Sequence, residues 1–168
     1  WALTALDRPG GAVGVAVSGG SDSMAMLHLM ARVAPQAGWT LRAVTVDHAL
    51  RSEAAAEADF VARVCAGLGV PRDVLVWDHG PINGNLIEQA REARYRLIAD
   101  WARGHGIGLV TLAHTADDQA ETFLIGLSRA AGLDGLTGMR QGWERQGITF
   151  HRPFLSLSRA ELRAYLTR

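Results

Sequence analysis

Short apolar runs alternate with helical patterns along the chain, and this alternation limits the folds that the sequence can adopt. The predicted strands cover residues 12–17, 41–46, 74–77, 109–113 and 148–150. The predicted helices cover residues 22–32, 52–68, 85–103, 115–128 and 159–168. Strands separated by helices of this length are joined by right-handed crossovers and form a parallel sheet with helices on both faces. We therefore predict an α/β fold whose ligands bind at the carboxyl ends of the strands.

The composition favours a single globular domain. Of the 168 residues, 48% are hydrophobic and 20% are charged, so we expect one domain over residues 1–168. No apolar run could cross a bilayer and no signal peptide is recognisable, so we expect a cytoplasmic protein with no membrane partner. The single cysteine, Cys65, excludes an internal disulfide and a zinc site built from thiolates. Because the sequence begins with Trp1 and ends within a predicted helix, we expect it to be the N-terminal part of a longer protein.

The charges balance. All seventeen basic residues are arginine, and they equal the seventeen acidic residues in number. Zero net charge argues weakly against a protein covered in positive charge for nucleic acid, but it is compatible with a local basic surface. Because the chain contains no lysine, any phosphate must be bound by other groups.

The strongest local signal is a loop that follows the first predicted strand and opens a helix. Its residues are Ser18, Gly19, Gly20, Ser21, Asp22 and Ser23. The glycines allow a tight turn and a close approach of the backbone to a ligand. Amides at a helix start attract anions, and serine hydroxyls donate hydrogen bonds to phosphate oxygens. The Walker spacing GxxxxGK[ST] is absent. A turn that only caps the helix does not account for all six residues, so we predict a phosphate-binding loop.

Two further polar clusters follow predicted strands. The segment 46–51 reads VDHALR, and it lies where an adenine or ribose could be held. On the residues alone, Asp47 and His48 are equally well explained as caps of the next helix. The segment 112–122 reads LAHTADDQAET.

The segment 112–122 carries three acids and a histidine. Asp118 and Glu121 are three residues apart and share one helix face, whereas Asp117 lies on an adjacent face. Carboxylates also favour the first turn of any helix, but that explains one or two acids and not His114 beside three. We predict that the cluster binds magnesium or the ammonium group of an amine substrate. On the helix over 85–103, Arg91 and Arg94 are three residues apart and share one face, whereas a solvated face accounts better for Arg96.

Together these motifs resemble one enzyme family. The loop at 18–23 is similar to the SGGxDS pyrophosphate loop of the N-type ATP pyrophosphatases. Segments 46–51, 90–95 (AREARY) and 113–122 resemble the V-D-H-x-L-R, A-R-x-x-R-Y and A-H-x-A-D-D-Q-A-E-T motifs of the tRNA(Ile)-lysidine synthetases. Segments 127–139 and 152–155 (RPFL) also follow the order of that family. The chain departs from the pattern at Thr115, where a second histidine is frequent, and at Ala130, where glycine is usual.

The resemblance implies a fold and a set of roles. The fold is the Rossmann-like N-type ATP pyrophosphatase (adenine nucleotide alpha hydrolase-like) fold, with ATP and Mg²⁺ as cofactors. The loop would hold pyrophosphate, the backbone at Val44 and Val46 would meet adenine, and His48 would lie against the nucleotide. Asp22 and Asp118 are assigned to magnesium. The catalytic residues implied are Asp22, Arg94, His114, Asp118 and Glu121.

The implied reaction modifies tRNA(Ile) with a CAU anticodon. ATP adenylates the 2-carbonyl oxygen of the wobble cytidine, and the amine of free lysine then displaces AMP. Family members are often homodimers. One alternative is a related enzyme that thiolates tRNA or amidates a small molecule, although thiolation generally needs paired cysteines or an iron–sulfur cluster. The other alternative is a nucleotide-binding module without catalysis.

Overall fold

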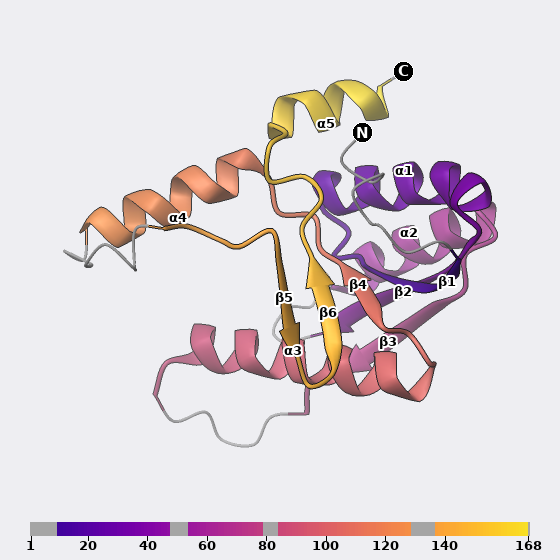
Figure 1. The fold of residues 1–168 in the computed structure, drawn as a ribbon, viewed down its shortest axis with the longest axis horizontal. Helices are drawn as coiled ribbons and strands as arrows, with labels where there is room; N and C mark the ends of the chain where they lie inside the picture. Colours follow the sequence, from indigo (N-terminus) through magenta and orange to yellow (C-terminus); the bar gives the residue numbers. More distant parts are fainter. Residues whose placement is uncertain (1–9, 48–53, 79–83, 129–136, 168) are drawn as a thin grey trace.

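The computed structural model describes residues 10–47, 54–78, 84–128 and 137–167, with side chains for all of these except 54–57. The elements follow one another in the order β1 Gly11–Ala16, α1 Ser21–Ala37, β2 Trp39–Asp47, α2 Ala54–Gly67, β3 Arg72–Val76, α3 Leu86–Gly104, β4 Leu109–Thr111, α4 Ala116–Ser128, β5 Gly142–Arg145, β6 Ile148–His151 and α5 Arg159–Leu166 (Figure 1). Apart from β5, this alternation is the one that the apolar runs predict.

The strands form one sheet in the order β3-β2-β1-β4-β6-β5. All neighbours pair in parallel except β5, which is antiparallel to β6. The chain moves from β1 outward to β2 and β3, and then passes β1 again to reach β4 on the other side. This reversal makes the carboxyl ends of β1 and β4 a topological switch point, where open α/β sheets bind ligands.

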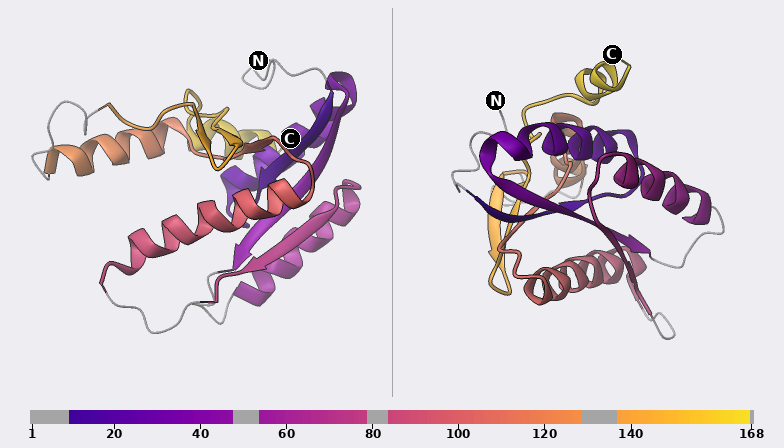
Figure 2. Two further views of the ribbon diagram at one scale, coloured as in Figure 1. Left: turned by 60° about the horizontal axis from the view of Figure 1, so that its bottom comes forward. Right: turned by 90° about the vertical axis from the view of Figure 1, so that its right-hand side faces the viewer.

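Helices cover both faces of the sheet. One apolar cluster joins α1, α2 and α5 to one face, and its members include Val15, Leu27 and Leu162. The other joins α3 to the opposite face, around Ile98 and Phe150. Figure 2 shows α1 and α3 on opposite sides of the strands, and Figure 1 shows α5 beside α1. Because successive strand residues point to opposite faces, β1 contributes to both clusters and is buried in the centre.

Gly14 of β1 permits the close approach of α3 to the sheet. A Cβ at this position would lie 3.0 Å from side-chain atoms of both Trp101 and Val110. Trp101 is 7% exposed, and its indole nitrogen donates a hydrogen bond of 2.8 Å to Asp73 on β3. The glycine therefore leaves the space that this indole fills, and α3 is held against the sheet that carries the site.

The structure confirms most of the predicted elements and corrects some. Asn85 caps α3, Ser158 and Glu161 form a capping box on α5, and Cys65 is buried. Helix α1 runs five residues beyond the predicted end at 32, to Ala37. On α2, Val61 and Cys65 are buried against the sheet, whereas the Phe60 side chain is 45% exposed.

The predicted strands do not include β5. Residues 142–145 form this strand, which pairs with β6 as a hairpin through the turn at Gln146 and Gly147. None of the helices in the described ranges is both long and apolar enough to cross a membrane.

Candidate active site

The loop after β1 has the geometry of an anion-binding turn. Gly19 has φ 91°, a left-handed conformation that favours glycine, and Gly20 is the N-cap of α1. The Ser23 hydroxyl accepts a hydrogen bond from the Ser18 amide at 3.2 Å and donates one to the Gly20 carbonyl at 2.8 Å. These bonds fix the loop from within.

The start of α1 is left open to a ligand. The first amides of a helix have no intrahelical acceptors, and Gly20 offers no side chain to cap them. The Ser21 hydroxyl donates to Asp22 at 3.2 Å, which keeps Asp22 in the first turn beside these amides. An anion at this helix start would therefore meet backbone donors and the favourable end of the helix dipole.

The second strand offers its backbone next to this loop. Along β2 the carbonyls of alternate residues face the same neighbouring strand, and Asp47 accepts from Trp77 on the β3 side. Val44 and Val46 therefore face β1, where the Val44 carbonyl already accepts the Val17 amide at 2.8 Å. Register with β1 ends at Val44, so Val46 faces the space beyond that strand, and no backbone hydrogen bond joins it there to another described residue. His48 lies outside the described residues.

The four predicted acids converge on one arginine. The Arg159 guanidinium donates to Asp118, to Glu121 at 2.7 Å, and lies 3.5 Å from Asp22. Its backbone amide donates to Asp117 at 2.8 Å. Asp22 comes from α1, the other three acids from α4, and Arg159 from the start of α5.

Sequence reasoning missed the role of Arg159. The capping box around Ser158 predicts the helix start, and it leaves Arg159 as an ordinary first-turn residue. No local spacing links it to the acids of α4 about forty positions earlier, so only the folded chain reveals the contact.

Hydrogen bonds fix Asp118 in its ionised form. Thr115 caps α4, and its amide and hydroxyl both donate to Asp118, at 2.7 and 2.9 Å. Burial raises the pKa of Asp118, but the Thr115 and Arg159 hydrogen bonds outweigh it, and the pKa lies below its usual range. The hydrogen bonds to Glu121 and Asp118 raise the pKa of Arg159. Thus Thr115, at which the sequence departs from the motif that it resembles, positions a carboxylate here.

His114 is held neutral beside this cluster. Burial, followed by the positive charges of Arg152 and Arg94, lowers its pKa to about 4. Arg152 Nε donates to His114 Nδ1 at 3.1 Å, so the ring proton resides on Nε2. His114 can therefore donate a hydrogen bond at neutral pH, and it is poorly suited to accept a proton.

Arg152 organises the region around His114. It is 4% exposed, and it also donates to the Arg140 carbonyl at 2.7 Å and to the Tyr95 hydroxyl at 3.3 Å. Its guanidinium lies 4.0 Å from the ring centre of Trp143. Burial lowers its pKa. Sequence analysis noted Arg152 only as part of the RPFL segment and assigned it no role.

Arg94 lies close enough to His114 for its charge to lower the pKa of that imidazole. It is partly buried on α3, and burial lowers its own pKa. Neither a hydrogen bond nor an ion pair joins its guanidinium to another of the described residues, so it keeps donors for a ligand. The structure thus places Arg94 near His114, and its role stays a prediction.

The acids fit a magnesium ion only in part. Among the described residues, no group of three or more histidine, cysteine or acidic side chains is arranged to hold a metal. Magnesium, however, is commonly bound by one or two carboxylates together with phosphate oxygens and water. Asp22 and Asp118 share Arg159 as a cationic neighbour and lie beside the phosphate-binding loop, so a bound polyphosphate would complete the oxygen ligands.

Comparison with known proteins identifies the family of this chain. The sequence profile of the PP-loop domain matches residues 3–168. The chain belongs to the PP-loop domain family. The matched region includes the loop at residues 18–23, whose sequence resembles the pyrophosphate loop of the N-type ATP pyrophosphatases.

The relatives of this PP-loop domain include tRNA-modifying enzymes. It is 50% identical over 159 residues to the tRNA(Ile)-lysidine synthase of Ruegeria pomeroyi, which covers 95% of this chain and 38% of that protein. It is 46% identical over 159 residues to the tRNA(Ile)-lysidine synthase of Rhodopseudomonas palustris, with 94% of this chain and 46% of that protein covered. The chain thus spans less than half the length of these relatives.

Solved structures confirm the predicted fold. A U34-tRNA thiolase from Methanococcus maripaludis superposes with a TM-score of 0.81 at 15% identity, over 95% of this chain and 57% of that one. An NMN synthetase from Francisella tularensis superposes with a TM-score of 0.55 at 16% identity, over 99% of this chain and 65% of that one. At such identities the likeness concerns the fold alone, which is the N-type ATP pyrophosphatase fold.

Proposed function

We propose that residues 1–168 form the N-terminal catalytic domain of a tRNA(Ile)-lysidine synthase that acts in the cytoplasm. The observation that carries the proposal is the convergence of a phosphate-binding loop, four acids and a neutral histidine at one edge of the sheet. The similarity to lysidine synthases over almost the whole chain supports the choice of reaction. The substrates are ATP, free lysine and tRNA(Ile) with a CAU anticodon.

In the first step ATP binds with its phosphates at the loop and its adenine against the backbone at Val46. Asp22 and Asp118 would hold Mg²⁺, which would supply positive charge to neutralise the phosphates. The cytosine 2-carbonyl oxygen attacks the α-phosphorus, and pyrophosphate leaves toward the amides of Gly20 and Ser21, which are oriented before the charge develops. The His114 Nε2 proton is available to a phosphate or cytosine oxygen.

In the second step the lysine amine attacks C2 of the adenylated cytidine, and AMP leaves. The ammonium group binds first to the carboxylates of Asp118 and Glu121, in competition with Arg159. Because its pKa is lowered, Asp118 is better suited to bind a cation than to take a proton. We assign proton acceptance from the amine to Glu121, whose side chain is 58% exposed and can pass the proton to solvent.

The test is transfer of labelled lysine to a tRNA(Ile) transcript with a CAU anticodon, with AMP counted in the same reaction. It uses the full-length protein, Asp118→Asn, and the control Asp100→Asn, which makes the same change on the exposed surface of α3. Lysine transfer by the wild type and the control, but not by Asp118→Asn, supports the proposal. Thermal unfolding of all three proteins checks that the Asp118→Asn variant is folded.

Two results separate the competing functions. AMP formed without lysine transfer would indicate a related PP-loop enzyme with a different nucleophile or RNA. ATP binding without AMP, with any tRNA, would indicate a nucleotide-binding module. Thiolation finds little support in this chain, because its single cysteine is buried in an apolar cluster and burial raises the pKa of that thiol.

A further inference from the structure

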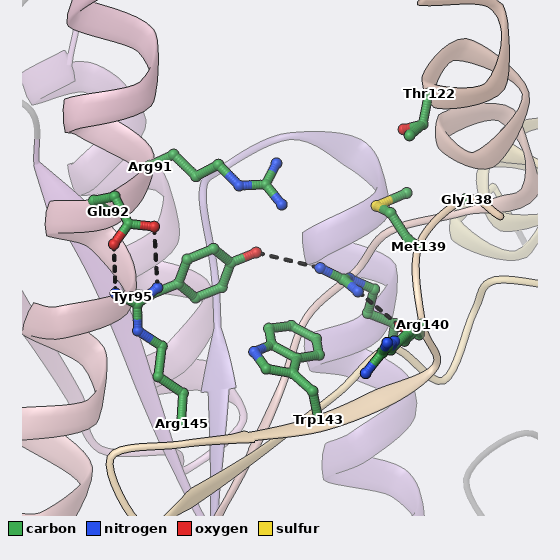
Figure 3. Close-up of a pocket in the computed structure, with 10 residues that line it drawn as sticks. Arg91, Glu92, Tyr95, Thr122, Gly138, Met139, Arg140, Trp143 and Arg145 are labelled. Atoms are coloured by element: carbon green, nitrogen blue, oxygen red, sulfur yellow. Dashed lines mark hydrogen bonds and ion pairs between the residues drawn. The ribbon is translucent and has the colours of Figure 1, made fainter. Parts of the chain in front are cut away.

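A pocket of about 340 Å³ lies beside the candidate active site, between α3, the start of β5 and the end of β6 (Figure 3). It adjoins the site at two points. Arg152 lines the pocket and donates to His114, and Thr122 lines it and donates to the Asp118 carbonyl one turn earlier on α4. A ligand in this pocket would therefore lie next to His114 and Asp118 of the candidate active site.

The walls of the pocket are strongly positive. Four arginines line it, together with one acid, Glu92. Glu92 is paired with Arg145 at 2.5 Å, so that arginine is already neutralised. The remaining three, Arg91, Arg140 and Arg152, form no ion pair with a described acid. Three formal positive charges therefore remain in one pocket of a chain whose net charge is zero.

The aromatic rings of the pocket are already covered. Phe150 stacks on Trp143 with ring centres 5.3 Å apart, and the Arg152 guanidinium lies over the Trp143 ring at 4.0 Å. The guanidiniums of Arg91 and Arg145 lie 5.7 and 5.6 Å from the ring centre of Tyr95. These rings support arginines and leave no open platform on which a base could stack. The pocket therefore suits an anion.

Among anions, a phosphate ester suits this pocket best. Arginine guanidiniums match the geometry of phosphate oxygens, and Arg152 is held by three neutral acceptors that leave its charge unbalanced. The ATP phosphates have their own loop at residues 18–23, on the β1 side of His114. The second phosphate source in the proposed reaction is the RNA backbone.

We propose that the pocket formed by Arg91, Arg140 and Arg152 binds a backbone phosphate of the RNA substrate, next to the nucleotide that reacts. The bound phosphate fixes the register of the RNA and places the reactive base at the carboxyl edge beside His114. This inference rests on the proposed function, because it takes the substrate to be an RNA. It concerns phosphate contacts, which position the RNA and carry no sequence preference.

The test measures binding of an anticodon stem-loop to the full-length protein at several salt concentrations. The variants are Arg91→Gln and Arg140→Gln, and the matched control is Arg96→Gln, an exposed arginine on the same helix as Arg91 and outside the pocket. Each pocket variant should weaken binding roughly tenfold, the loss expected for one charge-assisted hydrogen bond, and should lower the salt slope by about one. Arg96→Gln should bind the RNA as the wild type does, and all three variants should keep the wild-type affinity for ATP.

A methylphosphonate scan of the stem-loop then locates the phosphate. One neutral linkage should weaken binding to the wild type and have no further effect on Arg91→Gln. Unchanged RNA affinity and salt slope in both variants would overturn the proposal, and so would a loss of pyrophosphate or ATP affinity in place of RNA affinity. A wild type that binds the stem-loop through these arginines but transfers no lysine would overturn the proposed reaction and leave the phosphate pocket intact.

Discussion

The neutral state of His114 predicts a pH dependence that can be measured without substrates. Burial and the charges of Arg152 and Arg94 lower its pKa from the ordinary 6.5 to about 4. In the unfolded chain the His114 pKa returns to its ordinary value. Between pH 6.5 and pH 4 the unfolded state therefore binds a proton at this imidazole that the folded state does not bind. The His114 contribution to stability is therefore complete above pH 6.5 and is lost as the pH falls toward 4.

The size of this loss follows from the shift. The whole difference corresponds to about 3 kcal/mol, because one pKa unit is worth about 1.4 kcal/mol. Between pH 7 and pH 5 the same two pKa values predict a loss of about 2 kcal/mol. His114→Gln keeps a polar side chain at the position and removes the titration, so its stability should lack this part of the pH dependence.

Urea unfolding at pH 7 and pH 5 measures the difference for wild type, His114→Gln and the control His28→Gln. Between pH 7 and pH 5, the free energy of unfolding of the wild type and of the control should fall by about 2 kcal/mol more than that of His114→Gln. Carboxylates titrate in all three proteins, so their contribution cancels in the comparison. Equal losses in the wild type and His114→Gln would refute the depressed pKa, as would an NMR titration of His114 centred near 6.5.

Two other predictions concern packing and the acid cluster. Gly14→Ala should lower the free energy of unfolding by about 1–3 kcal/mol through overpacking against Trp101, whereas Gly104→Ala, where nothing lies near the added carbon, should not destabilise the protein in urea unfolding. Arg159→Met should raise the pKa of Asp118, because a hydrogen bond and a positive charge are lost. NMR titration of the carboxyl carbon measures this change, and an unchanged pKa would show that Thr115 alone fixes Asp118.

The parallel sheet was predictable because its signal is local. Each inner strand is buried on both faces and appears as an apolar run, and some helix starts carry a recognisable cap, such as Asn85 or Ser158. Strand β5 has the pattern Gly-Trp-Glu-Arg, without the apolar run of a buried strand, because it lies at the sheet edge with alternate residues exposed. Its pairing with β6 depends on the partner strand, and a composition rich in glycine gives no indication of it.

The candidate site likewise contains residues that local sequence predicts and residues that it does not. The loop at 18–23 and the acids of α4 could be predicted because each belongs to a strand end with a fixed spacing of polar residues. Arg159 and Arg152 could not, because their roles arise from contacts about forty positions apart in the chain. On α2, helical periodicity identifies an apolar face, but packing against the sheet decides how wide its buried part is, and Phe60 stays 45% exposed.

Charge is separated across His114, although the chain as a whole is neutral. On one side, three carboxylates face the guanidinium of Arg159 and a fourth, that of Asp117, accepts a hydrogen bond from its backbone amide. The cluster therefore keeps a formal excess of negative charge and still attracts a cation. On the other side, the pocket of Arg91, Arg140 and Arg152 attracts an anion. Arg159 need not block the first site, since partly exposed ion pairs contribute only about 0–1 kcal/mol each and exchange readily. A neutral donor between an acidic and a basic site suits a reaction that joins a cationic amine to an anionic RNA, because each substrate is drawn to its own side of the histidine.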